Sequence, residues 1–430
     1  MKAASNQRIA EVAATAELLS GAGVAHLRAC DRRLDGRHLE LTTGRVVHFG
    51  SCSYLGLEMD ERLKRGACEA IERFGVVFSS SRAYVSVPLF AELEELLVRV
   101  VGGFPVVVAP STSLAHQAAL PVLVDDGDAV CFDFFAHTSL QAVLPALAAR
   151  GVHCEPIPHD RLDVLERRAK RLAATHRRVF YLCDGVYSMH GDVAALDELY
   201  ALLERQPALF AYIDDAHGVG WAGRHGAGVV LGERRLHERM IVALGFSKSF
   251  GAGGAALVVP DAELGRRIFA CGGPMIFSGP LQPAQLGAGI ASARIHLSPE
   301  LTVLQGRLRA RMELFDGLAA ALGVEFSART RAPIRFVEVG SNERAAAMAR
   351  SLLDAGYFVN ASAFPAVPRG HAGIRLIAQR EPHARGRAEP RARARALSRQ
   401  RRRALAADAT DRRRVRRLNA EARRRRAALR

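Results

Sequence analysis

A single lysine stands at a place where the sequence could support covalent amine chemistry. The segment from Ile241 to Gly254 reads as an apolar strand, a polar turn with Ser247 and Lys248, and a glycine-rich stretch. We expect the Lys248 amine to be largely desolvated, which favours the neutral form that condenses with a carbonyl group. Ser247 offers a hydroxyl to an anion, and the glycines let the backbone approach a ligand closely. The alternative is a surface lysine beside a flexible loop.

Two further segments place ionisable side chains directly after apolar runs. Asp214 follows the run Leu209–Ile213, and His217 comes three residues later. A carboxylate at a strand end can pair with a protonated ring nitrogen, and His217 would reach the same ring. His137 follows the run Ala129–Phe132 and precedes a helix, a position that suits stacking on an aromatic ring. Taken alone, the first segment is better explained as a metal pair or a structural turn, and His137 as a helix cap.

Hydroxyl groups complete this set of candidate residues. Thr112 and Ser113 follow the run Val106–Ala109 and open a helix, where hydroxyls and free N–H groups bind phosphate well. Ser188 lies in a polar loop after the run Val179–Cys183 and could donate a hydrogen bond to a ring substituent or a substrate. A plain serine cap and an ordinary loop serine are the alternatives. The order of all the segments together is more specific than any one of them.

Short apolar runs alternate with longer amphipathic segments from about Leu57 to Gly289. The expected strands are Val106–Ala109, Ala129–Phe132, Val179–Cys183, Leu209–Ile213, Ile241–Leu244 and Ala255–Val259. The expected helices include Leu89–Val101, Ser139–Arg150, Leu162–His176 and Leu196–Arg205. This pattern predicts an α/β fold with a mostly parallel sheet covered on both faces. Ligands gather at the carboxyl ends of the strands in such sheets, which is where the candidate residues stand.

The remaining segments suggest further domains. Residues 1–55 are expected to form an N-terminal arm with a helix and a hairpin, and residues 56–295 a large domain that holds the site. A connecting helix over Pro299–Leu322 then leads into a small α+β domain, residues 296–378. Its expected elements are the strand Ile334–Val339, the helix Glu343–Ala355 and the strand Tyr357–Asn360. The pattern stops near Arg375.

The composition is ordinary for a globular protein, with 49% hydrophobic and 24% charged residues. No run of about 18 apolar residues suggests a membrane span. The seven cysteines form no C-x-x-C pair, so we expect a reduced, cytoplasmic protein without a disulfide framework or a metal site.

Basic charge is concentrated in the last part of the chain. Residues 380–430 hold 20 Arg and five acidic residues, a net charge of +15 in a chain of net charge +16. We expect residues 379–430 to be a disordered tail, because they lack aromatic residues that could form a core. One hypothesis is a shifted reading frame. The other is a basic arm that binds nucleic acid or anionic surfaces; otherwise we expect neither a nucleic-acid partner nor a membrane.

Several motifs together resemble the α-oxoamine synthases, a family of pyridoxal-5′-phosphate (PLP) enzymes with the fold-type I transferase fold. The similarity runs from about Ser51 to Arg375. The motifs that carry it are Tyr187-Ser-Met-His-Gly-Asp192, Ile213-Asp-Asp-Ala-His217, Ser247-Lys248 and Gly272-Gly-Pro-Met-Ile-Phe-Ser278. The family includes 8-amino-7-oxononanoate synthases, 2-amino-3-ketobutyrate CoA ligases and autoinducer synthases.

The resemblance implies a role for each candidate residue around the cofactor ring. Lys248 would hold PLP as a Schiff base and move the α-proton, and Asp214 would pair with the pyridine nitrogen. His217 would contact the ring hydroxyl, His137 would stack on the ring, and Ser188 would lie beside it.

The resemblance also implies a phosphate site and a substrate site. Thr112, Ser113 and Ser247 would hold the phosphate, helped by Ser278 from the second subunit of a homodimer. Arg375 would bind the amino-acid carboxylate. The implied partners are an amino acid and an acyl thioester of coenzyme A or of an acyl carrier protein.

The implied reaction is a decarboxylative condensation of these two partners to an α-aminoketone. One alternative is an aminotransferase of the same fold, and another is an inactive or nucleic-acid-binding protein that acts through its tail. Several positions depart from the family pattern. Cys52 and Ser53 stand for Asn and Asp, Asp184 for Glu and Ala366 for Thr. Near the expected phosphate site, Thr112 stands for Gly, His116 for Asn and Gly245 for Thr. The last change removes one expected phosphate hydroxyl.

Overall fold

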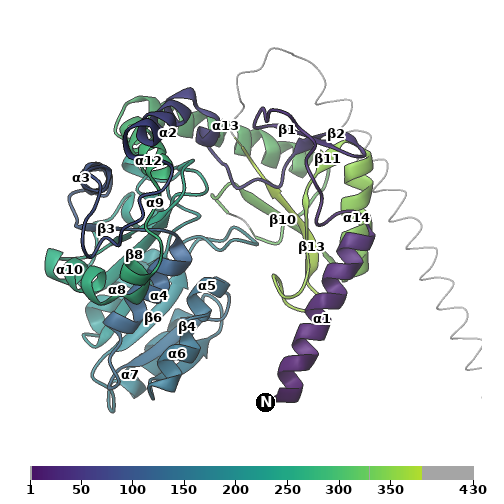
Figure 1. The fold of residues 1–430 in the computed structure, drawn as a ribbon. Coiled ribbons are helices and arrows are strands. Elements are labelled where there is room, and N and C mark those ends of the chain that lie inside the picture. The colour runs from purple at the N-terminus through teal and green to yellow at the C-terminus, as the bar shows by residue number, and fades with distance from the viewer. Residues whose placement is uncertain (1, 329, 380–430) are drawn as a thin grey trace, which may run out of the picture. The chain divides into compact units, whose positions relative to one another are not determined.

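A computed structural model describes residues 2–328 and 330–379 of the chain (Figure 1). A seven-stranded sheet is built in the order β3-β9-β8-β7-β6-β4-β5, with β9 antiparallel to both of its neighbours. The pairs β5–β4, β4–β6, β6–β7 and β7–β8 are parallel. The strands are β3 Val106–Ala109, β4 Ala129–Asp133, β5 His153–Ile157, β6 Val179–Asp184, β7 Leu209–Asp214, β8 Met240–Gly245 and β9 Ala255–Val258. The predicted mostly parallel α/β sheet is therefore confirmed.

Both faces of this sheet are buried. In β6, Val179, Tyr181 and Cys183 pack into one hydrophobic cluster, while Phe180 and Leu182 pack into another. Successive side chains of a strand point to opposite faces, so a strand covered on both sides has to be apolar throughout. All six strands predicted from apolar runs are present for this reason.

The strand β5 was not predicted from the sequence. It lies at the edge of the sheet, contains Pro156, and has exposed or half-buried residues except for Ile157. An edge strand tolerates proline and polar side chains because one of its sides makes no ladder. Its sequence therefore lacks the apolar run that identifies the central strands.

The helices of this part of the chain follow the predicted segments with two differences. They are α2 Glu61–Phe74, α3 Leu89–Val100, α4 Thr112–Leu123, α5 Thr138–Gln141, α6 Leu144–Ala149, α7 Leu162–Leu172, α8 Leu196–Arg205, α9 Gly228–Leu231, α10 Ala262–Cys271, α11 Gly273–Phe277 and α12 Pro283–His296. The single helix predicted over Ser139–Arg150 is wrong, because Pro145 starts a second helix, α6. The helix predicted to reach His176 ends at Leu172. None of the described helices is long and apolar enough to cross a membrane.

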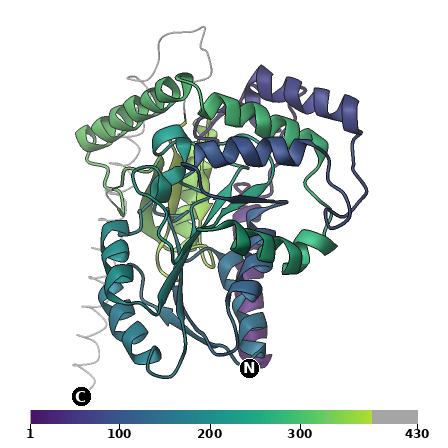
Figure 2. The same cartoon turned by 90° about the vertical axis from the view of Figure 1, so that its left-hand side faces the viewer.

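Helices α2 and α12 pack side by side, as both views of the ribbon show (Figures 1 and 2). A Cβ atom on Gly287 of α12 would lie 2.1 Å from the carbonyl oxygen of Gly66 in α2. The two helix backbones can approach so closely only because both positions are glycine.

The beginning and the end of the described chain pack together. The remaining elements are α1 Lys2–Gly21, β1 His38–Leu41, β2 Gly44–His48, α13 Glu300–Ala321, β10 Ile334–Gly340, α14 Asn342–Asp354, β11 Tyr357–Phe358, β12 Asn360–Ser362 and β13 Ala372–Ile377. Strand β2 pairs with β1 and β11, and β13 pairs with β10 and β12. Helix α1 contacts α14. The predicted helix and hairpin of the arm are present, but they join the C-terminal elements; the domain boundaries themselves stay a prediction. The predicted tail lies outside the described residues, apart from Gln379.

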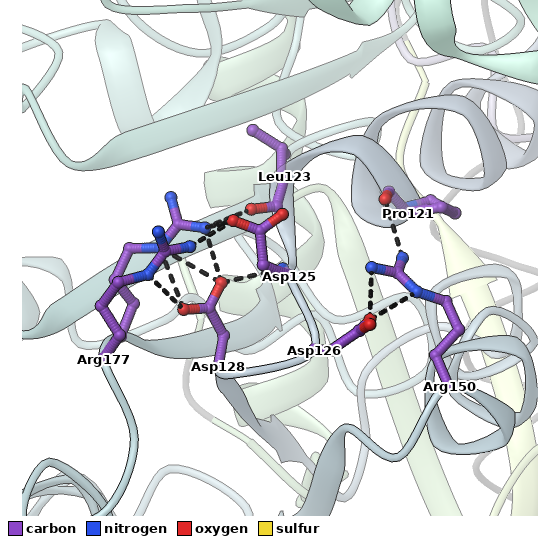
Figure 3. A network of polar contacts seen from close by, with 8 residues as sticks. Pro121, Leu123, Asp125, Asp126, Asp128, Arg150 and Arg177 are labelled. Atoms are coloured by element: carbon purple, nitrogen blue, oxygen red, sulfur yellow. Dashed lines mark hydrogen bonds and ion pairs between the residues drawn. The ribbon is translucent and has the colours of Figure 1, made fainter.

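A polar network joins the loop before β4 to the start of β6 (Figure 3). Asp128 is fully buried and accepts hydrogen bonds from Arg178 Nη2 at 2.5 Å and Arg177 Nε at 3.4 Å. Asp126 is 72% exposed and pairs with Arg150 Nη2 at 2.8 Å. The two aspartates belong to one loop but differ in burial, which makes them a matched pair for a stability test.

We expect Asp128→Ala to lower the free energy of unfolding by about 3 kcal/mol, because the partly buried Arg178 loses its nearer carboxylate and the Asp125 N–H loses its acceptor. Asp126→Ala is the control and should cost less than about 1 kcal/mol, since exposed ion pairs contribute little. Urea denaturation of the two variants measures the difference. Equal losses in both variants would contradict this account of the network.

Candidate active site

A cavity of about 210 Å³ lies at the carboxyl ends of the central strands. Its lining residues are Ser111, Thr112, Ser113, His137, Ser139, Asp184, Val186, Asp214, Ala216, His217, Ser247 and Lys248. Seven predicted site residues are among them, and they come from the ends of three strands, β4, β7 and β8, and from the start of α4. A larger cavity of about 440 Å³ lies between α2, α3 and α12. It contains none of the predicted residues, and its Arg62 and Arg294 are paired with Glu300 and Glu92.

Lys248 is held in a tight loop after β8. Phe246 and Phe250 are fully buried on either side of it, with their rings stacked at 4.7 Å. The backbone N–H of Gly251 donates to the Lys248 carbonyl at 3.1 Å, and Gly251 has φ +75°. The buried rings of Phe246 and Phe250 hold the loop in place, and the Lys248 side chain between them lines the cavity. Lys248 is half-buried, and the expected desolvation of its amine stays a prediction.

Asp214 ends β7 and is the most strongly held carboxylate of the site. Its Oδ1 accepts the Ala216 N–H at 2.9 Å, and its Oδ2 lies 3.0 Å from His116 Nε2. Burial alone would raise the pKa of Asp214, but the hydrogen bond from His116 and the charge of Lys248 bring it below its usual value. Asp214 is therefore ionised and able to pair with a cation.

The two predicted histidines line the cavity in different ways. His217 is buried, with Nδ1 2.7 Å from the Tyr54 hydroxyl, and burial together with the Lys248 charge lowers its pKa well below the usual value. It is thus neutral at pH 7. His137 caps α5, as the alternative interpretation proposed, with Nδ1 2.7 Å from Ser139 Oγ. The cap still lines the cavity, so the two interpretations of His137 are compatible.

The start of α4 supplies hydroxyls to the cavity. Ser111 caps the helix by accepting the Leu114 N–H at 3.2 Å, and Thr112 and Ser113 follow it. A Cβ atom at Gly245 would lie 3.0 Å from Thr112 Oγ1. The Thr112 hydroxyl thus occupies the space beside position 245, where the sequence lacks the expected threonine.

Three predicted residues do not line the cavity. Arg375 on β13 donates from Nη1 to the Ser188 carbonyl at 3.0 Å, and its buried Nε has no hydrogen-bond partner among the described residues. Its charge contributes to the lowered pKa of His217, which places it near the site. Ser278 Oγ donates to the Pro274 carbonyl at 2.5 Å within its own segment. Its predicted role in a second subunit stays a prediction.

Comparison with known proteins assigns the family. Residues 45–378 match the family model "Aminotransferase class I and II". The 8-amino-7-oxononanoate synthase of Fervidobacterium nodosum is 33% identical over 339 residues, which is 77% of this chain and 83% of that protein. The chain belongs to the α-oxoamine synthases of this family. The enzyme of the same name from Geobacter sulfurreducens is 34% identical over 340 residues, 77% of this chain and 83% of that protein.

Solved structures agree on the fold of this α-oxoamine synthase. Serine palmitoyltransferase from S. paucimobilis, solved with bound PLP–myriocin, covers 90% of this chain and 95% of its own with a TM-score of 0.78 at 23% identity. An 8-amino-7-oxononanoate synthase from Francisella tularensis covers 78% of this chain and 92% of its own, with a TM-score of 0.63 at 19% identity. The predicted fold-type I transferase fold is confirmed.

Two residues of this α-oxoamine synthase that contact predicted site residues were not predicted from the sequence. Tyr54 contacts His217, and His116 contacts Asp214. In the sequence, His116 stands out only as a departure from the family pattern. One signal was available: His116 stands four residues after Thr112, so both lie on one face of the predicted helix.

A neighbouring carboxyl group leads to a pH prediction. Asp215 is fully buried, accepts the Val230 N–H at 3.0 Å, and burial raises its pKa to about 8. The unfolded value is about 3.9, so between these two pH values the folded state binds a proton that the unfolded state has released. Stability therefore falls as the pH rises through this window.

We expect Asp215→Asn to remove this pH dependence. Between pH 4 and pH 8 the free energy of unfolding of the variant should fall less steeply than that of the unaltered protein, by up to about 1.4 kcal/mol per pH unit. Urea denaturation of both proteins across this range measures it. Parallel stability curves for the two proteins would show that Asp215 does not titrate as described.

Proposed function

We propose that this α-oxoamine synthase condenses an amino acid with an acyl thioester, with loss of CO₂, to give an α-aminoketone. The observation that carries the proposal is one cavity that combines the Lys248 amine, the ionised Asp214 and the hydroxyls of α4. The chain is a PLP-dependent enzyme by its family. Bound PLP supplies an electron sink for negative charge on the amino-acid α-carbon.

The residues of the cavity fit this cofactor. Asp214 presents a negative charge that would keep the pyridine nitrogen protonated, and the half-buried Lys248 amine would make the covalent link. Thr112, Ser113 and Ser247 offer hydroxyls to the phosphate near the N-terminus of α4. The bare Gly245 leaves room for the Thr112 hydroxyl.

The same residues would bind the substrate and move its proton. Lys248 Nζ would accept the α-proton of the bound amino acid. His217 is neutral, so it would offer a hydrogen bond to the ring oxygen without adding a second positive charge beside Lys248. Arg375, with its unpartnered Nε and Ser188 beside it, would bind the amino-acid carboxylate.

A homodimer would complete the phosphate site. The loop between α2 and α3 contacts helix α11 through the hydrogen bond from Ser81 Oγ to the Ile276 carbonyl. Both segments expose large apolar side chains. These side chains are Val76, Val77, Tyr84, Val85 and Phe277. Exposed apolar clusters of this kind mark interfaces, and this one adjoins Ser278, which would then reach the phosphate of a second copy. The seven free cysteines suit a reducing compartment, so we place the enzyme in the cytoplasm.

Product analysis tests the proposal. The purified chain is mixed with PLP, with glycine, alanine or serine, and with acyl thioesters of coenzyme A or of a carrier protein. We expect CO₂ and free thiol in equal amounts, together with an aminoketone. A keto acid formed without CO₂ would instead identify an aminotransferase, and no turnover of any pair would refute both.

A further inference from the structure

Three buried side chains form a line behind the cavity. His116 Nδ1 lies 2.9 Å from the Tyr212 hydroxyl, and His116 Nε2 lies 3.0 Å from Asp214 Oδ2. Tyr212 and Asp214 are two residues apart in β7, so their side chains share one face of the sheet. His116 and Tyr212 are completely buried, and Asp214 is 6% exposed. The imidazole therefore bridges a buried phenol and a carboxylate that lines the cavity.

The hydrogen atoms of this line can be assigned from its end groups. A carboxylate only accepts hydrogen bonds, so His116 Nε2 carries a hydrogen and donates it to Asp214. Burial raises the pKa of Tyr212 well above its usual value, so the phenol keeps its proton and can donate to His116 Nδ1. Tyr212 thereby fixes the orientation of the ring that holds Asp214.

Three buried carboxyl groups meet near the ends of β6 and β7. Asp184 on β6 lies opposite Asp214 on β7 in the strand register, and Asp215 directly follows Asp214 in the chain. Burial raises the pKa of Asp184 well above its usual value and that of Asp215 to about 8, so burial favours the neutral form of both carboxyl groups. Of the three, only Asp214 has an imidazole as a partner. His116 thus distinguishes the carboxyl group that carries the charge.

We propose that His116 is a positioning residue that keeps Asp214 ionised and aimed at the cavity, and so sets how strongly the enzyme holds the ring nitrogen of its cofactor. This inference rests on the proposed function, in which Asp214 pairs with the pyridine nitrogen. His116 acts through Asp214 and lies outside the cavity lining. Its effect should therefore depend on the nitrogen atom of the ring.

The test compares two probes on the full chain freed of cofactor: PLP and its 1-deaza analogue, in which CH replaces the ring nitrogen. The ratio of their dissociation constants measures the preference for the ring nitrogen. We expect His116→Phe, which fills the space without a donor, to lower this preference about tenfold, the usual effect of losing a hydrogen bond to a charged group. His116→Gln retains an N–H donor and should retain most of the preference. Tyr212→Phe should lower it about two- to threefold.

The outcomes separate the two proposals. If His116→Phe folds and binds both probes more weakly by the same factor, His116 is merely structural and the inference is wrong. If His116→Phe does not fold, Tyr212→Phe decides: an unchanged preference overturns the inference, and a reduced one supports it. If the unaltered chain binds neither probe, the proposed function itself fails and takes this inference with it.

Discussion

Replacing Lys248 with alanine should lower turnover at least about 10⁴-fold, because the variant loses both the covalent link and the group that takes the α-proton. The expectation is specific to this residue, since the whole chain has only four lysines: Lys2, Lys64, Lys170 and Lys248. Steady-state thiol release by the variant and the unaltered enzyme measures the loss.

Lys170→Ala is the matched control for this prediction. Lys170 is exposed on α7 and lies outside the cavity, so turnover should stay unchanged. If Lys248→Ala keeps more than about a tenth of the activity, another group performs the chemistry and the assignment of Lys248 is wrong.

Asp214→Asn should lower kcat/KM by about 10²- to 10³-fold. An amide has nearly the shape of the carboxylate but no charge, so it cannot stabilise a protonated ring nitrogen. The loss should appear in kcat, because the charge matters most when electrons are withdrawn from the substrate. Thiol release at saturating and at low amino acid separates kcat from KM.

Asp215→Asn is the control for charge at the adjacent position. Asp215 is buried, neutral at pH 7 and outside the cavity lining, so this variant should retain activity within about threefold. Similar losses at the two positions would mean that local packing, rather than the charge of Asp214, supports the reaction.

The sequence predicted the central sheet well for a physical reason. Strands that are buried on both faces need unbroken apolar runs, and these are visible in β6, β7 and β8 without any structure. Strand β5 is polar because it lies at an edge, and Pro145 divides a helical segment that otherwise looks continuous. The position of β5 at an edge depends on its neighbours in space, which local sequence does not describe, whereas the break at Pro145 is a local signal that the sequence does carry.

The residues that line the candidate site could be predicted from the sequence, but the residues that contact them from behind could not. Residues that directly follow central strands meet at one edge of the sheet, so Asp214, His217 and Lys248 were found from their positions alone. The contacts of His116 and Tyr54 depend on how a helix and a distant loop dock on the sheet. Their partners lie 98 and 163 positions away in the chain, and no spacing rule links them.

Borohydride reduction of the protein saturated with PLP tests the central claim most directly. Reduction makes the link between cofactor and amine permanent, and mass spectrometry of peptides then locates it. We predict one phosphopyridoxyl group per chain, on the peptide that contains Lys248, and none in Lys248→Ala. A label spread over Lys64 and Lys170, or a Lys248→Ala variant labelled as fully as the unaltered enzyme, would contradict the account.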